Sequence, residues 1–241
     1  MKRAILVGLL VALCGGLAAA GPLKVVLVSG SGEYKSAESL PTLKKYLEES
    51  YNAQCTLLQA QDDKELPGLE ALDDCDVLLL FTRRLKLEGD QLERLKGYCQ
   101  AGKPLVGVRT ASHAIQTWLD LDKEVLGGNY HGHYGGGAKQ QVTLVPEAKD
   151  HPVLKGVEPF ESDYSLYKTS PVAKDATVLL MGTTPKAEQP EPAAWVREHK
   201  GARIFYTSLG GLNDFADPSF RQMIVNALFW AARRGVEPKA K

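Results

Sequence analysis

The histidines of this chain concentrate in a glycine-rich segment that could approach a ligand closely. Residues 127–137 read Gly-Gly-Asn-Tyr-His-Gly-His-Tyr-Gly-Gly-Gly, which places His131 and His133 two positions apart beside Tyr130, a candidate substrate-binding residue. Two imidazoles at that spacing share a face in an extended loop, and glycine lets the backbone come near a bound group. Three interpretations stay open: a divalent metal such as zinc, direct contact with a sugar or other substrate, and a purely structural loop. A zinc site would need further protein ligands, for which the chain offers Glu33, His113, Asp150 and His151.

A second group of polar residues lies where a buried strand should turn sharply into a helix. Residues 107–113 read Gly-Val-Arg-Thr-Ala-Ser-His, and such a turn displays a nucleophile when its centre is Ser or Cys. Here the centre is Arg109, whose guanidinium stays protonated and can bind oxygen atoms but cannot attack a carbonyl. Arg109 is therefore either a ligand anchor or one half of an internal salt bridge.

Ser112 and His113 follow on the same turn and are candidates for substrate contact and for proton transfer, respectively. Adjacent residues on a helix point about 100° apart, which argues against a catalytic Ser–His pair. We expect Ser112 either to contact substrate or to satisfy a helix amide. His113 acts in the site or packs inside the helix.

Alternating strands and helices must position these groups. Short apolar runs predict four strands, at residues 25–28, 55–58, 77–81 and 104–108. Helical patterns lie between several of them, and continuously apolar strands imply that helices cover both faces of the sheet. The pattern predicts an α/β fold, a three-layer sandwich whose first half is flavodoxin-like and parallel.

Ligands of such open sheets bind beyond the carboxyl ends of the parallel strands. The loops at that edge are residues 29–36, 82–87, 109–113 and 208–215. They add Tyr34, Arg83 and Asp214 as candidate substrate-binding residues and Glu33 as a candidate catalytic base.

The second half of the chain has a different order of predicted elements. Strand-like runs follow one another with only turns or brief helices between several of them, at residues 141–145, 177–181, 193–198 and 203–207. This predicts an antiparallel extension of the sheet, closed by an amphipathic helix over residues 220–233. We expect one domain over residues 21–236 and a disordered tail at residues 237–241. His151, in an Asp-His-Pro turn, is expected to cap or pack that loop.

The first twenty residues have the pattern of a secretory signal peptide. Lys2 and Arg3 precede an apolar stretch over residues 4–17, and three alanines end at Ala20. We expect cleavage near Ala20, a secreted or periplasmic protein and no membrane span after cleavage. The alternative, a lipid on Cys14, is disfavoured by the bulky Leu13 before it.

Composition narrows the classes of function. Hydrophobic residues make up 44% and charged residues 24% of the chain, which excludes disordered, collagen-like and coiled-coil proteins. Lys+Arg and Asp+Glu both number 29 with no basic block, so nucleic acid is not an expected partner. Beyond the signal, Cys55, Cys75 and Cys99 lack C-x-x-C spacing and predict free, buried thiols.

Several of these segments, taken together and in order, resemble the ThuA-like family, named for trehalose utilisation. The segments that carry the resemblance are 28–30 with 33–35, 81–84, 106–114, 127–133, 150–152 and 203–210. The resemblance covers nearly the whole chain after the signal. It implies a fold similar to class I glutamine amidotransferase domains and a setting in carbohydrate use, often beside sugar oxidoreductases and 3-keto-glycoside chemistry.

By position, the resemblance places Arg109 where amidotransferases carry their nucleophile, so glutaminase activity is not expected. The chain also departs from the family. Relatives commonly have a histidine after the Ser-Leu-Gly of the last strand, where this sequence has Gly211. If that histidine works in relatives, the site here is incomplete, or Asp214 or a water takes its place.

These observations support one leading hypothesis and two alternatives. The leading hypothesis is an exported protein that binds a sugar in a crevice formed by Glu33, Arg109, His113, His131 and His133. If it is an enzyme, it would be a lyase, isomerase or hydrolase that moves a proton on a keto-sugar, with a histidine or Glu33 as base. The alternatives are a non-catalytic accessory module of an exported sugar oxidoreductase or glycoside-processing system, and a metal-dependent hydrolase.

Overall fold

The computed structural model describes residues 21–136 and 138–239. The expected signal peptide therefore lies outside the described residues. Within them, no helix is both long enough and apolar enough to cross a membrane.

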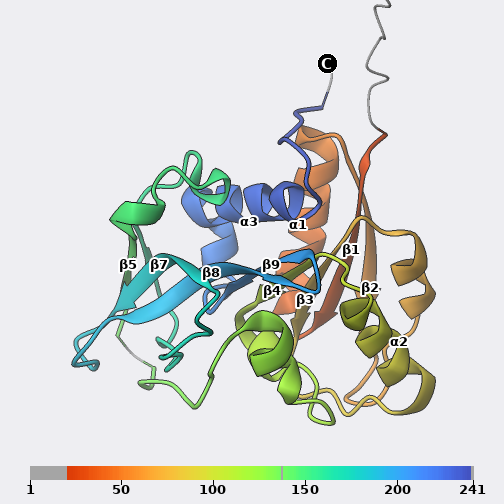
Figure 1. Ribbon diagram of the computed structural model, residues 1–241, viewed down its shortest axis with the longest axis horizontal. Helices are drawn as coiled ribbons and strands as arrows, with labels where there is room; N and C mark the ends of the chain where they lie inside the picture. Colours follow the sequence, from red (N-terminus) through yellow and green to blue (C-terminus); the bar gives the residue numbers. More distant parts are fainter. Residues whose placement is uncertain (1–20, 137, 240–241) are drawn as a thin grey trace, which may run out of the picture.

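The described residues form a nine-stranded sheet in the order β2-β1-β3-β4-β9-β8-β7-β5-β6 (Figure 1). Its parallel half consists of β1 (Leu23–Gly30), β2 (Ala53–Gln59), β3 (Val77–Thr82), β4 (Leu105–Val108) and β9 (Ala202–Thr207). The order 2-1-3-4 followed by one more parallel strand is the flavodoxin-like arrangement, so the predicted fold class is confirmed.

The antiparallel extension begins where β8 joins β9. It consists of β8 (Glu191–His199), β7 (Thr177–Thr183), β5 (Gln140–Leu144) and β6 (Phe160–Ser162). The sequence pattern missed β6, because a strand of three residues is too short to show a period.

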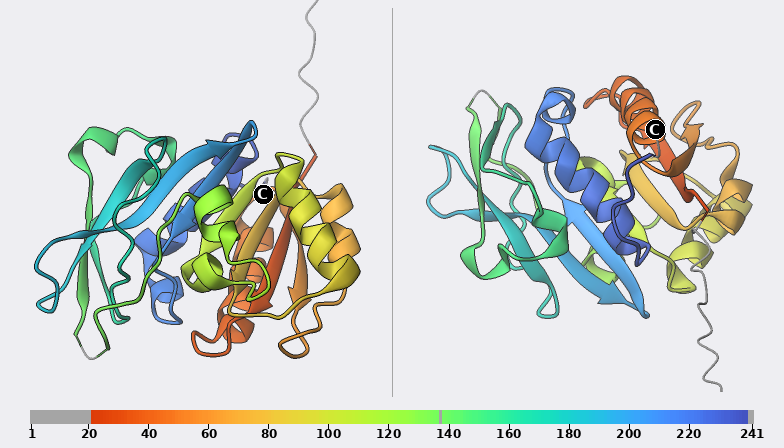
Figure 2. Two further views of the ribbon diagram at one scale, coloured as in Figure 1. Left: turned by 60° about the horizontal axis from the view of Figure 1, so that its bottom comes forward. Right: turned by 90° about the horizontal axis from the view of Figure 1, so that it is seen from above.

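Helices cover the parallel half on both sides. Helices α1 (Ser36–Ser50) and α3 (Pro218–Ala231) lie on one face, and α2 (Gly89–Gln100) lies on the other (Figures 1 and 2). Residues of β1 alternate between the two cores: Leu27 packs with α1 and α3, whereas Val28 packs with α2. The described part of the chain also contains six short helices: Leu69–Asp74 (η1), Arg109–His113 (η2), Leu121–Leu126 (η3), Pro146–Ala148 (η4), Pro152–Leu154 (η5) and Asp214–Ala216 (η6).

Two expectations about the end of the chain and the cysteines need correction. The disorder expected from residue 237 is wrong for residues 237–239, because Asn52 N–H donates to Glu237 O (2.8 Å) and Lys239 N–H donates to Ser50 O (2.9 Å). The three described cysteines are free, as predicted, but Cys75 is only partly buried.

Candidate functional site

The turn after β4 forms a 3₁₀ helix, η2, which comprises Arg109–His113 of the turn predicted from the sequence. Arg109 opens it with φ +50°, a left-handed conformation that a non-glycine residue rarely adopts. β4 and its neighbours on either side, β3 and β9, bring the loops after β1, β3 and β9 to the same edge of the sheet. The turn thus lies at the carboxyl edge, where the fold places ligands.

Arg109 is fully buried, with 0% of its surface exposed. Its Nη1 donates to Ser208 O, and Nη2 donates to Ser165 O (2.9 Å), Ser165 Oγ (3.1 Å) and Tyr34 Oη (3.3 Å). The guanidinium carbon also lies 4.0 Å from the ring centre of Tyr167 and 4.6 Å from that of Tyr34. We call these residues, with Tyr164, the arginine cage.

The arginine cage answers the question that the sequence left open about Arg109. Among the described residues the guanidinium forms no ion pair, and it has no exposed surface with which to contact a ligand. The side chain instead binds oxygen atoms of its own chain and packs against aromatic rings. We therefore reassign Arg109, and with it Tyr34, from substrate contact to positioning of the loop that holds Ser165 and Tyr167.

Gly211 borders the arginine cage, and the Tyr164 ring leaves no room for a side chain at this position. A Cβ built on Gly211 would lie 1.7 Å from Cε2 of Tyr164, well inside contact distance. The Tyr164 ring thus occupies the space in which a residue 211 side chain would stand. The proposed replacement, Asp214, is also buried, and its Oδ2 accepts the Gly210 and Gly211 N–H groups at 2.7 and 2.9 Å. It holds this loop and has little surface left for a substrate.

The other end of the same turn faces an open pocket of about 470 Å³. The imidazole of His113 stacks on the ring of Tyr130, with ring centres 4.5 Å apart and planes inclined by 20°. We call this the His113 pocket. It is lined by Arg84, Ser112, His113, Gln116, Leu119, Asp120, Asp122, Lys123 and Tyr130.

Ser112 and His113 form a hydrogen bond although they are adjacent in the sequence. Ser112 Oγ lies 3.0 Å from His113 Nδ1. The 100° separation applies to Cβ directions on a regular helix, whereas here a short side chain reaches the near nitrogen of its neighbour's ring. Because Nδ1 is engaged, Nε2 is the ring nitrogen that remains for a ligand.

The electrostatics of the pocket keep His113 neutral. Burial lowers its pKa to about 3, and the positive charges of Arg84, Arg83 and Arg109 act in the same direction. His113 can therefore hydrogen-bond to a ligand near neutral pH, but it holds no proton there with which to act as a cationic acid.

Asp122 is a site residue that the sequence interpretation missed. It is 6% exposed, lines the pocket, and its Oδ2 accepts the Tyr130 N–H at 2.8 Å. Burial raises the pKa of this carboxyl to about 6, and Oδ1 has no hydrogen-bond partner among the described residues. Nothing in the spacing around Asp122 marks it, because an acidic residue on a short amphipathic turn is normally solvated.

The local backbone explains how a carboxyl group comes to lie there. Residues Leu121–Leu126 form a π-helical turn, a geometry often found at functional sites. A Cβ on Gly128 would lie 2.1 Å from Asp122 Oδ1, so only glycine allows the chain to pass so close. Gly128 thus allows the backbone to approach the carboxylate, whereas a Cβ on Gly127 would instead meet the side chain of Arg197.

The remaining predicted residues lie near the pocket but do not line it. Glu33 forms an ion pair with Arg83 (Oε2 to Nε, 2.7 Å) and is exposed. His131 and His133 are exposed: His131 Nδ1 lies 2.7 Å from Asn129 O, and His133 Nδ1 accepts the Gly135 N–H at 3.0 Å. Of the five residues expected to form the crevice, His113 lines this pocket.

The described donor set does not fit a zinc site, one of the three interpretations that the sequence left open. The described residues contain no group of three or more His, Cys, Asp or Glu side chains that could hold a metal ion. Of the four supplementary ligands named from the sequence, His151 instead caps η5 by accepting the Val153 N–H, as expected for a loop residue. Glu33 is engaged by Arg83.

Aromatic contacts link the arginine cage to the His113 pocket. Tyr167 packs on Arg109 from one side, and its ring centre lies 4.6 Å from that of Tyr130 on the other. An isolated β-bridge pairs Tyr167 with His133. Arg109 therefore fixes the wall against which Tyr130 and His113 stack.

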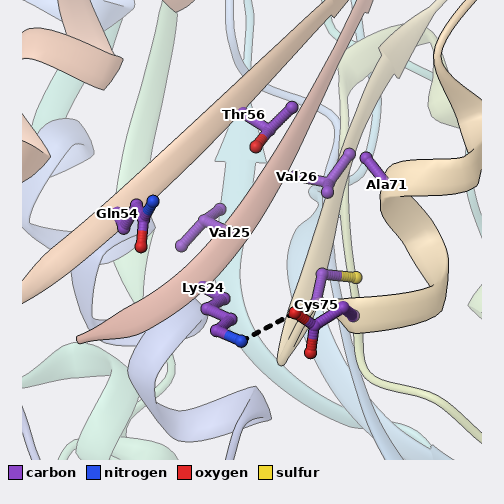
Figure 3. Close-up of a pocket in the computed structure, with 8 residues that line it drawn as sticks. Lys24, Val25, Val26, Gln54, Thr56, Ala71 and Cys75 are labelled. Carbon is purple, nitrogen blue, oxygen red and sulfur yellow. Dashed lines mark hydrogen bonds and ion pairs between the residues drawn. The ribbon is translucent and has the colours of Figure 1, made fainter. Parts of the chain in front are cut away.

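A second cavity, of about 300 Å³, lies at the opposite end of β1 (Figure 3). It is lined mainly by Lys24, Val26, Gln54, Thr56, Ala71 and Cys75, and Lys24 Nζ pairs with Asp74 at 2.7 Å across it. This is the amino end of the parallel strands, away from the edge where such folds bind ligands. We assign no site there.

Comparison with solved structures places the fold. The chain is similar to a ThuA-like protein from Parabacteroides merdae, with 18% identity, a TM-score of 0.71 and coverage of 91% of this chain and 93% of that one. A ThuA-like protein from Bacteroides uniformis gives 20% identity, a TM-score of 0.67 and coverage of 89% and 93%. A GMP synthase component from Thermoplasma acidophilum gives 12% identity, a TM-score of 0.55 and coverage of 89% and 96%.

No curated protein matches the chain. A family model described as trehalose utilisation matches residues 24–231, from the start of β1 to the end of α3. The chain therefore belongs to the ThuA family.

Proposed function

We propose that this chain is an exported protein of carbohydrate utilisation that binds a sugar in the His113 pocket and has no glutaminase activity. The family's description, trehalose utilisation, supports the substrate class. The pattern of Lys2, Arg3 and the alanines ending at Ala20 supports export.

The observation that carries the proposal is the stacked pair of His113 and Tyr130 in a polar pocket at the carboxyl edge of the sheet. Small-molecule sites combine aromatic walls with a few placed polar groups. Sugars need both, because their C–H faces are apolar and their hydroxyl groups donate and accept hydrogen bonds. Arg109 supports the second part of the proposal, since a buried guanidinium at the nucleophile position cannot attack an amide.

If the protein is an enzyme, Asp122 rather than Glu33 or a histidine would transfer the proton on a keto-sugar. A carboxyl with a pKa near 6 exchanges protons close to neutral pH, which suits elimination, isomerisation or glycoside cleavage. Glu33 is held by Arg83, and His113 titrates far below neutral pH.

A second candidate function is a non-catalytic sugar-binding module of an exported oxidoreductase or glycoside-processing system. The neutral state of His113 favours it, because a neutral imidazole is suited to holding a ligand. A metal-dependent hydrolase is not proposed, since the described donor set lacks a third ligand beside His131 and His133.

Thermal-shift measurements with trehalose and 3-keto-trehalose test the proposal. We expect either sugar to raise the melting temperature of the wild type, and Tyr130→Ala to abolish the shift. Gln54→Ala, in the cavity at the amino end of the strands, should retain it. No shift with any sugar would contradict the proposal. NMR of the mixtures then separates an enzyme, which changes the sugar, from a binding module, which does not.

A further inference from the structure

The His113 pocket has opposite charges on its walls. Arg84 and Lys123 line it as cations, and Asp120 and Asp122 line it as carboxylates. Arg84 is exposed and, among the described residues, forms no ion pair, whereas its neighbour Arg83 is neutralised by Glu33. Within the described part of the chain, two cations that line the pocket, Arg84 and Lys123, therefore form no ion pair, and Arg84 is the guanidinium of the two.

The backbone holds Arg84 in place beside His113. Its N–H donates to His113 O at 2.9 Å, and the next residue, Leu85, pairs with Ile115 in an isolated parallel bridge. Arg84 has φ +53°, a left-handed conformation that is strained for a residue with a Cβ. Strained residues of this kind are concentrated at ligand clamps.

We propose that the sugar bound in the His113 pocket carries a carboxylate, and that Arg84 binds this carboxylate while Asp120 and Asp122 face the sugar's hydroxyl groups. This inference rests on the proposed function and narrows its substrate class to sugar acids. A planar guanidinium binds a carboxylate through two parallel hydrogen bonds, whereas a neutral sugar offers the guanidinium no opposite charge.

The acidic residues of the pocket distinguish a carboxylate from a phosphate. Asp120 and Asp122 both line the same pocket. A dianionic sugar phosphate would meet them with twice the repulsion of a monoanion, and the two cations that line the described pocket, Arg84 and Lys123, are already matched in number by these two carboxylates. We therefore expect sugar carboxylates to bind more tightly than sugar phosphates.

Calorimetric titration with glucose, glucuronate and glucose 6-phosphate tests the inference. Wild type should bind glucuronate about tenfold more tightly than glucose, as expected for a hydrogen bond to a charged group, and more tightly than glucose 6-phosphate. Arg84→Gln should reduce the affinity for glucuronate to that for glucose, and Arg84→Lys should restore part of the preference. Arg94→Gln, an exposed arginine on α2 outside the pocket, should behave as wild type. Circular dichroism checks that each variant is folded.

The outcomes separate the two proposals. Equal affinity for glucose and glucuronate, or an Arg84→Gln variant that keeps the preference, overturns the sugar-acid assignment and leaves the sugar site standing. Tighter binding of glucose 6-phosphate than of glucuronate also overturns it. Failure of every sugar to bind overturns the proposed function and the inference together.

Discussion

The two ends of one five-residue turn lie in opposite environments. Arg109, at its start, is sealed in a cage of backbone carbonyls and tyrosines, whereas His113, at its end, lines an open pocket. The charged residue is thus the structural one, and the neutral ring faces the ligand space. A residue's place in a motif therefore does not decide its role, because burial determines which side chains a ligand can reach.

Removal of Arg109 should have the largest effect on stability. Arg109→Ala leaves the carbonyl groups of Ser208 and Ser165 without their donor and opens a cavity among the tyrosines. We expect a loss of about 4 kcal/mol in the free energy of unfolding, measured by urea denaturation. Arg94→Ala, on the surface, should cost less than about 0.5 kcal/mol. Equal small losses in both variants would mean that Arg109 does not hold the cage.

Substitution of His113 should change how stability depends on pH. The folded state keeps the imidazole neutral down to about pH 3, whereas an unfolded histidine takes up a proton below about pH 6.5. The unfolded state therefore binds more protons in this window, and stability falls as the pH falls. Between pH 7 and pH 4, wild type should lose about 3 kcal/mol relative to His113→Gln.

Ser112→Ala is the matched control for His113→Gln, because it removes the hydrogen bond to Nδ1 but keeps the imidazole. It should retain most of the pH dependence of wild type. NMR should show no titration of His113 between pH 5 and pH 8. A titration in that range would show that the ring is not shielded by the pocket.

Asp122 should contribute a pH dependence of the opposite sign. Its folded-state pKa of about 6 lies above the ordinary value of 3.8, so the folded state binds more protons between these limits. Stability from this group falls as the pH rises from about 4 to about 6. Relative to wild type, Asp122→Asn should gain about 2 kcal/mol between pH 4 and pH 7 in urea denaturation. Asp120→Asn, which keeps the buried carboxyl, should not reproduce this gain.

Gly211→Ala should have the smallest effect, at the outer border of the arginine cage. The new Cβ would overlap the Tyr164 ring, which is only partly buried and can move aside. We expect a loss of about 1.5 kcal/mol. Gly97→Ala, at an open helical position on α2, should instead stabilise the protein slightly. If Gly211→Ala combined with Tyr164→Ala costs as much as the sum of the single changes, the two residues are not coupled.

Much of the fold could be predicted from the sequence, because continuous apolar runs and helical stripes report burial directly. The runs at residues 77–81 and 203–207 correspond to β3 and β9, and the closing helix corresponds to α3. Departures from regular helical geometry could not be predicted from these patterns. The segment after Arg109 forms 3₁₀ and π turns in place of a regular helix, and Ser112 there forms a hydrogen bond with His113 that the sequence pattern did not predict.

The candidate site was predicted in part. His113, Ser112 and Tyr130 were identified and do line one pocket. Asp122 was missed, since only the close approach of Gly128 desolvates its carboxyl group. Glu33, His131 and His133 were placed in the crevice because residue type and loop position cannot show that a side chain is already paired or exposed.

Hydrophobic periodicity and residue chemistry, which are local properties, were enough to establish three features of this protein. They are the parallel first half of the sheet, the edge at which the polar loops gather, and the lack of a nucleophile at the centre of the turn. The enclosure of Arg109, and the meeting of Asp122 with His113 in an open pocket, emerged only from the folded chain. The first depends on tyrosines distant in the sequence and the second on the close approach of Gly128, because desolvation is set by the neighbours that packing brings together.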